Sequence, residues 1–349
     1  MSPDGTVRAD PGPGELAAAA SQDAPFWLDL SEMTAELADW LERGLGLHPL
    51  VIEDARQFGE RPKLEEFEDY VAVVMYGAGA ATSVSQLVLP GRSGAPVTSA
   101  PMTSASASAI DVRSLDSLGE VHCIVSARYI VTVHRNTCPA LEEAARRASA
   151  SNALAAGPGS VFYQFADALA DSFFPVMDEL DDRLDALQAE IIESPHRSQL
   201  TELAGYRAML TPLRKVLLPQ ADIVDALASG KVRVPGADED QLPYLRDIRD
   251  HLRKLADLAD SYRDHIAATA DSYSSVVSNQ LNVVMKQLAV ISTIFLPLSF
   301  LTGFFGQNFG ALVNHIGSWP AFLGFGVGTE VVAVILLYLM FRRQGWLKS

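Results

Sequence analysis

The sequence predicts an α+β domain followed by a long helical stalk and two C-terminal membrane-spanning helices. Strand-like apolar runs occur before about residue 140, and every strong signal after Leu141 is helical. Two long apolar stretches then close the chain. The first of them, 288–306, carries no charged residue and is about as long as a helix that crosses a bilayer core. We therefore expect a membrane protein with most of its mass outside the bilayer.

Composition sets the expected segment boundaries. The start of the chain is rich in Asp, Pro, Gly and Ala, which is typical of disorder, and a Gly/Ala/Ser/Thr/Pro tract later interrupts the strand-rich part. The expected segments are a disordered N-terminus (1–24), a cytoplasmic α/β domain (25–140) with a flexible insertion (77–109), a helical hairpin and stalk (141–285), the first transmembrane helix (286–306), an external loop (307–318), the second transmembrane helix (319–341) and a cytoplasmic basic tail (342–349).

The α/β domain is expected to contain strands at 26–30 and 70–76, because both runs are apolar or β-branched. Two further runs, 121–126 and 129–134, are separated by two residues and predict a hairpin. Ser31 is a plausible cap for an amphipathic helix that ends near residue 45.

Three long helices are expected to follow. The first covers 162–193 and ends before Pro195, and the second returns over 199–227. The third covers 244–306, which corresponds to roughly 95 Å of helix at about 1.5 Å per residue. A rod of that length needs neighbouring helices or other subunits to pack against, and it continues directly into the first apolar span.

The charge balance excludes one class of partner. Lys and Arg number 27 against 43 Asp and Glu, a formal charge of −16, which would repel the phosphates of nucleic acid and attract cations. Plain solubility is the alternative reason for this charge. Cys123 and Cys138 have neither metal-site nor disulfide-framework spacing, so a reducing compartment is the simpler assumption.

The basic residues predict the orientation in the membrane. Lys286 precedes the first span, Arg342, Arg343 and Lys348 follow the second, and the connecting loop contains no Lys or Arg. The positive-inside rule then places both termini in the cytoplasm and the loop outside. With no secretory signal at the start, we expect a multi-pass protein of the inner (plasma) membrane.

Three separated motifs, in order, give this chain its likeness to a known family. They are 47–54 with 61–65 and Tyr70; the stalk positions between Tyr262 and Lys286; and 294–300 followed by Gly303 and Gly306-Gln307-Asn308. The chain resembles the CorA family of divalent-cation (magnesium/cobalt) transporters over nearly its whole length, as a variant with Gly-Gln-Asn in place of Gly-Met-Asn. The resemblance implies a funnel-shaped homopentamer in a lipid bilayer, with Mg²⁺ as transported and regulatory ion and no cofactor.

Gly306, Gln307 and Asn308 are the expected pore mouth. Hydrated Mg²⁺ sheds water reluctantly, so neutral amide and carbonyl oxygens can hold its first-shell waters without stripping them. The resemblance implies a ring of Asn308 side chains at the outer entrance, whereas a plain turn is the structural alternative. Gln307 replaces the family's Met, and the loop that follows has no carboxylate. Its His315 could recruit a softer metal such as zinc, which leaves ion preference open.

Below the mouth, small polar and apolar residues recur at three- and four-residue steps on one side of the expected helix. Such a stripe fits a pore wall, and it also fits a helix-packing face. The expected pore-lining residues are Asn282, Met285, Leu296 and Ser299.

Glu330 is an acid inside the second apolar span, where a charge is costly. Counting in from the outer ends of both spans places it at the depth of Phe295, near Ser292 and Ser299. We expect the Glu330 carboxyl group to be protonated, or hydrogen-bonded to Ser or Thr of the first span, which locks the two helices together. Proton coupling is the alternative role.

The resemblance also implies a cytoplasmic Mg²⁺ site that holds the pore shut. Opposed carboxylates repel, and a bridging cation removes that cost. Surface acids that are merely solvated are the alternative. The candidate sensing residues are Glu53, Asp54, Asp247, Asp167 and Asp171.

The leading functional hypothesis is therefore a Mg²⁺ channel gated by cytoplasmic Mg²⁺ at subunit interfaces. The alternative on the same scaffold is a zinc or other transition-metal transporter, coupled to protons through Glu330. An enzyme is disfavoured because His134 and Cys138 belong to no visible set of nucleophile, base and orienting group. A non-conducting scaffold or sensor is the remaining class.

Overall fold

The computed structural model of the chain divides into two compact units, 1–270 and 271–349. Helix α9 (Leu242–Phe305) runs from the first unit into the second. The predicted insertion, external loop and basic tail lie almost wholly outside the described residues. The described residues are 1–2, 7, 11–21, 24–79, 118–135, 138–237, 239–307 and 318–343.

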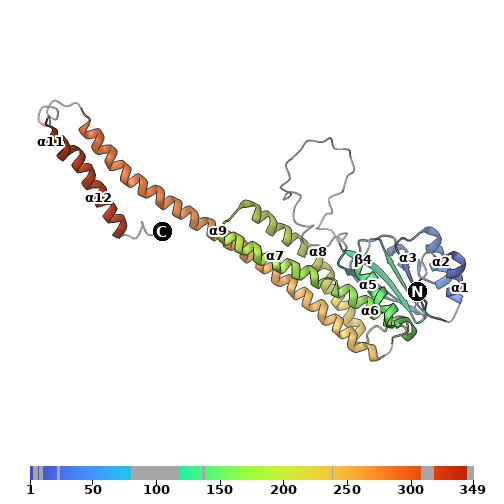
Figure 1. Ribbon diagram of the computed structural model, residues 1–349. Helices are drawn as coiled ribbons and strands as arrows, with labels where there is room; N and C mark the ends of the chain where they lie inside the picture. The colour runs from blue at the N-terminus through green and yellow to red at the C-terminus, as the bar shows by residue number, and fades with distance from the viewer. Residues whose placement is uncertain are drawn as a thin grey trace, which may run out of the picture. The chain divides into compact units, whose positions relative to one another are not determined.

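The first unit is built on a five-stranded sheet of order β1-β5-β4-β3-β2 (Figure 1). β1 runs parallel to β5, and the other neighbours are antiparallel. The three central strands are almost entirely buried, which explains why they read as continuous apolar runs. The predicted strands and hairpin are confirmed, and one charged edge strand was not predicted. The strands are β1 Phe26–Leu30, β2 Lys63–Glu66, β3 Tyr70–Gly77, β4 Gly119–Ser126 and β5 Tyr129–His134.

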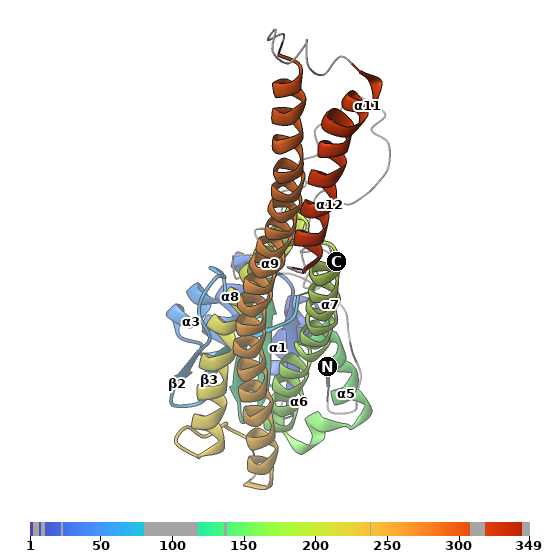
Figure 2. The same cartoon turned by 90° about the vertical axis from the view of Figure 1, so that its left-hand side faces the viewer.

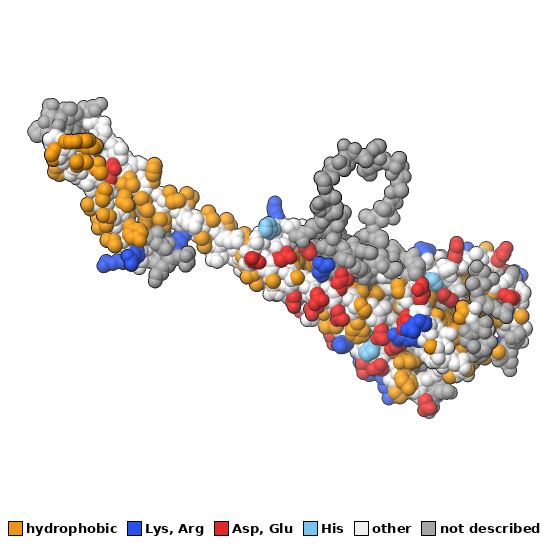
Figure 3. All heavy atoms as spheres, in the orientation of Figure 1, with side chains coloured by type: hydrophobic (Ala, Val, Ile, Leu, Met, Phe, Trp, Pro, Cys, Tyr) orange, Lys and Arg blue, Asp and Glu red, His pale blue; other side chains and the backbone are white. Residues whose placement is uncertain are grey.

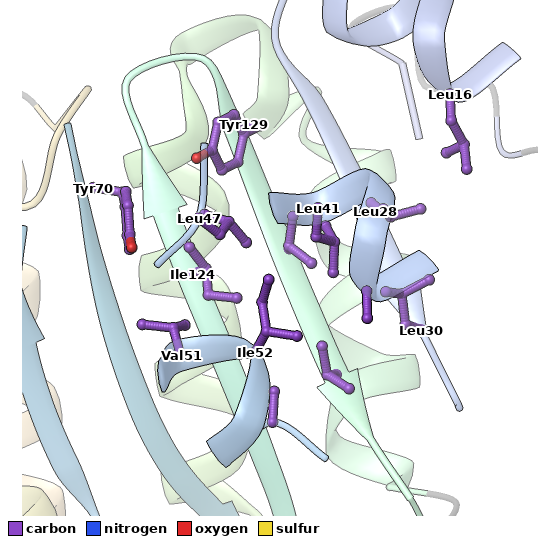
Figure 4. Close-up of a cluster of buried hydrophobic side chains, with 14 residues drawn as sticks. Leu16, Leu28, Leu30, Leu41, Leu47, Val51, Ile52, Tyr70, Ile124 and Tyr129 are labelled. Atoms are coloured by element: carbon purple, nitrogen blue, oxygen red, sulfur yellow. The ribbon is translucent and has the colours of Figure 1, made fainter. Parts of the chain in front are cut away.

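Three short helices cover one face of the sheet: α1 (Pro13–Ser21), α2 (Ala35–Leu45) and α3 (Pro49–Asp54). Their apolar side chains meet those of the strands in a single cluster, in which Ile124 of β4 lies beneath the helices (Figure 4). Burial of this cluster fixes α3, whose last two residues are candidate cation ligands, on the sheet.

The expectation that residues 1–24 are disordered is wrong for α1. Leu16, 6 % exposed, belongs to the buried cluster, and Arg128 Nη2 donates to the backbone oxygen of Ala20 over 2.7 Å. The Met1 amino group donates to the carbonyl of Trp27 over 2.7 Å. Composition missed these contacts because they depend on one leucine and on backbone groups.

Two local turns use polar side chains that the sequence pattern did not single out. α2 begins after Thr34 instead of Ser31, because the Thr34 hydroxyl accepts from Leu37 N over 3.3 Å. In the β4–β5 hairpin, Ser126 Oγ accepts from Arg128 N over 3.1 Å. That bond stabilises a two-residue turn that lacks the usual Gly or Asn.

Helices α5 (Pro139–Ala150), α6 (Pro158–Asp171) and α8 (Arg197–Ala228) pack near the other side of the sheet, and a 3₁₀ turn (Ala153–Ala156) joins the first two. Gln220 of α8 is fully buried, and its Oε1 accepts from Tyr76 N over 2.7 Å. β2 pairs with β3 only as far as Val74, so Gln220 supplies the acceptor that a longer edge strand would have given.

Replacing Gln220 by alanine is expected to lower the free energy of unfolding by about 1–3 kcal/mol, because the buried Tyr76 N–H loses its acceptor. Thermal unfolding of the detergent-solubilised protein measures the effect. Gln57→Ala, at an exposed site, is the matched control and should change stability by less than about 0.5 kcal/mol. Equal shifts in the two variants would contradict the role given to Gln220.

The expected single helix over 162–193 is two helices, α6 and α7 (Phe174–Glu193). Pro175 has no backbone N–H, and its ring would clash with the carbonyl of Asp171, so α6 ends there. Phe173, fully buried, fills the break. The return helix α8 and the long helix α9 confirm the remaining helical predictions, and a short 3₁₀ turn (Glu239–Gln241) precedes α9.

The second unit is a helical hairpin formed by the end of α9 and a second apolar helix, which run side by side (Figures 1 and 2). The second helix comprises α11 (Trp319–Ala321), a π-helical stretch (Phe322–Val327) and α12 (Gly328–Arg343). Both helices are long and apolar enough to cross a membrane, and their apolar windows are not buried within the protein. Hydrophobic side chains cover much of the visible surface of this unit in Figure 3.

Candidate metal sites

Two carboxylates and one imidazole converge in the first unit. Asp167 and Asp171 lie one helical turn apart on α6, and His251 approaches from α9. One potential ligand atom from each of the three lies within 4.8 Å of the others. His251 Nδ1 is 3.2 Å from Asp171 Oδ1 but makes no hydrogen bond within the described residues. We call Asp167, Asp171 and His251 the carboxylate–imidazole cluster.

A fourth candidate, Asp247, lies one turn before His251 on α9, with its Oδ2 3.9 Å from His251 Nε2. The structure therefore brings three predicted sensing residues, Asp167, Asp171 and Asp247, to one place. His251 was not among the predicted residues. Its four-residue spacing from Asp247 was visible in the sequence and is the signal that could have found it.

Arg147 of α5 already supplies positive charge to the cluster. Its Nη1 lies 3.1 Å from Asp167 Oδ2 and 4.0 Å from Asp171 Oδ2, while its Nε lies 2.7 Å from Glu143 Oε1. These ion pairs offset part of the repulsion between the two aspartates. A cation entering the cluster would compete with the guanidinium.

The pKa values around the cluster reflect burial and excess negative charge. Burial, and next the neighbouring Asp171 carboxylate, raise the pKa of Asp167. Burial followed by the charges of Asp167 and Asp247 raises the pKa of the Tyr163 phenol to about 12. Both shifts arise first from burial and then from the negative charge of neighbouring carboxylates.

The other predicted sensing residues lie on α3 and have partners of their own. Lys63 Nζ lies 2.5 Å from Asp54 Oδ2 and 2.6 Å from Glu60 Oε2. Burial lowers the pKa of Lys63, but these hydrogen bonds outweigh it and leave the pKa raised. Glu53 is exposed and accepts from Gln57 Nε2 over 3.0 Å. Among the described residues, neither acid joins the carboxylate–imidazole cluster.

At the predicted pore mouth, Gly306 and Gln307 follow the last turn of α9. Gly306 N donates to Thr302 O over 2.9 Å, and Gln307 N donates to Phe304 O over 3.3 Å. Both residues are exposed. Asn308 and His315 lie outside the described residues.

The predicted pore-lining side chains are all exposed on α9 in the single chain. Met285 is 65 % exposed and Leu296 is 75 % exposed, which are large values for apolar side chains. Large exposed apolar surfaces of this kind are typical of helices that contact lipid or other protein chains. The residues are Asn282, Met285, Leu296 and Ser299.

Glu330 forms the expected hydrogen bond to a Ser or Thr of the first span, but at a different depth from the one expected. Thr302 Oγ1 lies 2.8 Å from Glu330 Oε1. The predicted neighbours near Phe295 are further from the mouth than Thr302. Counting assumed that both spans start at the same depth and rise equally, and the observed partner lies seven positions nearer the mouth than Phe295.

The structure combines a mixed α/β unit, which carries the carboxylate–imidazole cluster, with an apolar helical hairpin. The family model for the CorA-like Mg²⁺ transporter protein matches residues 22–87 and 104–343, which include both parts. The chain belongs to the CorA-like Mg²⁺ transporter family. Membership of this transporter family supports the transport of divalent cations on this scaffold.

Individual CorA-like relatives align over nearly the whole chain. The cobalt/magnesium transport protein CorA of Thermotoga maritima is 27 % identical over 328 residues, covering 93 % of this chain and 84 % of that protein. The zinc transport protein ZntB of Yersinia pseudotuberculosis is 26 % identical over 336 residues, with 95 % and 89 % covered.

Solved structures give the same CorA-like fold. The complete CorA magnesium transporter of Methanocaldococcus jannaschii superposes with a TM-score of 0.71 at 19 % identity, covering 93 % of each chain. The full-length CmaX protein gives a TM-score of 0.64 at 22 % identity, with 91 % of this chain and 87 % of that chain covered. The predicted fold class is thereby confirmed.

Proposed function

We propose that this CorA-like chain is a Mg²⁺ channel that closes when Mg²⁺ occupies carboxylates of its cytoplasmic domain. The observation that carries the regulatory part is the convergence of Asp167, Asp171 and His251 from two helices. The permeation part rests on the exposed end of α9, where Gly306 and Gln307 precede Asn308.

Electrostatics supplies the closing mechanism. Burial and the Asp171 charge disfavour ionisation of Asp167, so the empty cluster holds costly negative charge that Arg147 offsets only in part. A divalent cation binds the ionised carboxylates and removes their repulsion. Glu53 and Asp54 on α3 and Asp247 on α9 supply further oxygens across subunit boundaries. When the ion leaves, the repulsion returns and the subunits separate.

In this proposal several copies of the chain surround the pore. The resemblance to the CorA family implies five copies. The apolar helices lie in the inner membrane with both termini in the cytoplasm, as the basic flanks indicate. Asn308 amides ring the outer mouth and hold waters of the hydrated ion. Asn282, Met285, Leu296 and Ser299 line the path below them.

Flux into liposomes tests the proposal on the full-length protein. An inward-negative potential is expected to drive Mg²⁺ entry, and an imposed pH gradient of either sign should leave the rate unchanged. Inhibition of Mg²⁺ flux by added Co²⁺, Ni²⁺ or Zn²⁺ shows the order in which the protein prefers these ions. An impermeable protein that still assembles would overturn channel function in favour of a scaffold or sensor.

A transition-metal transporter is the second candidate, and His251 is the observation that favours it. Imidazole suits zinc, whereas Mg²⁺ prefers oxygen ligands. Relatives at similar identity are named zinc transport proteins. Zn²⁺ flux that exceeds Mg²⁺ flux and accelerates with a proton gradient would support this candidate against the first.

A further inference from the structure

Thr302 links the two apolar helices close to the end of α9. Its Oγ1 lies 2.8 Å from Glu330 Oε1 on α12 and 2.8 Å from Leu298 O on its own helix. Both contacts lie within one compact unit. In an apolar environment a carboxyl group needs such a partner, because water is not there to solvate it.

The same residue also holds the mouth segment. Thr302 O accepts from Gly306 N over 2.9 Å, so the backbone of Thr302 closes the last turn of α9. Its side chain thus connects the second span to the turn that carries Gly306 and Gln307.

The ring contacts of this turn are made within its own helix, where Phe304 lies against Phe300 and Phe305. Gly303 has no side chain, and a Cβ built there would meet nothing within 4 Å. The facing helix is glycine-rich and π-helical over Phe322–Val327, just before Glu330. The hydrogen bond between Thr302 and Glu330 is therefore a specific polar restraint between the two helices close to this turn.

We propose that Glu330 is a positioning residue for cation selection, which it exerts by holding Thr302 and thereby the Gly306–Gln307 segment. The inference rests on the proposed transport function. The carboxyl group does not touch the ion in this mechanism. Loss of the bond loosens the geometry of the mouth, so that ions differing in hydration are discriminated less well.

The test pairs disruptive with conservative substitutions in the full-length protein. Thr302→Val and Glu330→Leu remove the hydrogen bond, whereas Thr302→Ser and Glu330→Gln retain a donor and an acceptor at the same places. The readout is the ratio of Mg²⁺ to Co²⁺ flux in liposomes, with assembly followed by size-exclusion chromatography. Thr293→Val, on the same helix and exposed, is the matched control.

We expect the disruptive variants to change the flux ratio by about tenfold, which corresponds to about 1.4 kcal/mol. The conservative variants and Thr293→Val should keep the wild-type ratio. The double variant Thr302→Val/Glu330→Leu should match either single one, because both remove one bond. Should Glu330→Leu not assemble, Glu330→Asp serves instead, since it keeps the acid but shortens its reach by one methylene.

The inference fails, and the proposed function stands, if Thr302→Val and Glu330→Leu (or Glu330→Asp) both keep the wild-type ratio of Mg²⁺ to Co²⁺ flux. It also fails if Thr302→Ser does not keep that ratio. A wild-type protein that carries no cation would contradict the proposed function, and the inference with it.

Discussion

Replacing Asn308 by alanine is expected to lower Mg²⁺ flux into liposomes by ten- to a hundredfold. Each copy loses an amide oxygen that holds a first-shell water, and a hydrogen bond to a charged group contributes about 1.5–3 kcal/mol. The loss should appear as reduced uptake of the hydrated ion at every membrane potential, with assembly unchanged.

Asn314→Ala is the matched control for that experiment, because it removes an identical amide from the same loop. We expect it to conduct like the wild type. If Asn308→Ala conducts normally while the protein assembles, the ring of amides is not the entrance and the permeation proposal fails.

Neutralising the carboxylate–imidazole cluster is expected to have the second large effect. In Asp167→Asn/Asp171→Asn, cytoplasmic Mg²⁺ should inhibit flux at least about tenfold less potently, since the two ligand charges are gone. The measurement is flux against Mg²⁺ concentration on the cytoplasmic side. Asp264→Asn, an exposed acid on α9, is the control and should leave inhibition unchanged.

The same variant carries a stability signature with a defined sign. Because the pKa of Asp167 is raised, its contribution favours the fold fully below the ordinary aspartate pKa and is lost as the pH rises through the raised value. At neutral pH and without Mg²⁺, the ionised Asp167 carboxylate therefore adds nothing to the stability of the fold. Asp167→Asn/Asp171→Asn should then melt at a higher temperature than the wild type. Mg²⁺ should raise the melting temperature of the wild type and not of the variant. A wild type whose melting ignores Mg²⁺ would contradict binding at this cluster.

Local patterns predicted the elements that depend on neighbours in sequence. Strands at 26–30 and 129–134 follow from short apolar runs, and the helix from Leu242 to Phe305 follows from the absence of breakers before Pro297. The break before Pro175 was missed, although proline chemistry marks it. Helix α1 was missed because its order comes from one buried leucine.

The candidate site was predicted in part. Resemblance pointed to Asp167, Asp171 and Asp247, but resemblance says nothing of which side chains approach one another. Their meeting with His251 and Arg147 required α5, α6 and α9 to pack together. The Asp54–Lys63 pair likewise depends on how α3 lies against β2.

The sequence by itself determined the order of domains, the long helix and the apolar hairpin, because periodicity and the hydrophobic length of a span are local properties of a chain. Only the tertiary structure decided that Glu330 bonds Thr302 and that His251 joins two aspartates. Thr302 and Glu330 are 28 positions apart, and His251 is 80 positions from Asp171 and 84 from Asp167. Their distances in space depend on how the helices pack, which composition does not reveal.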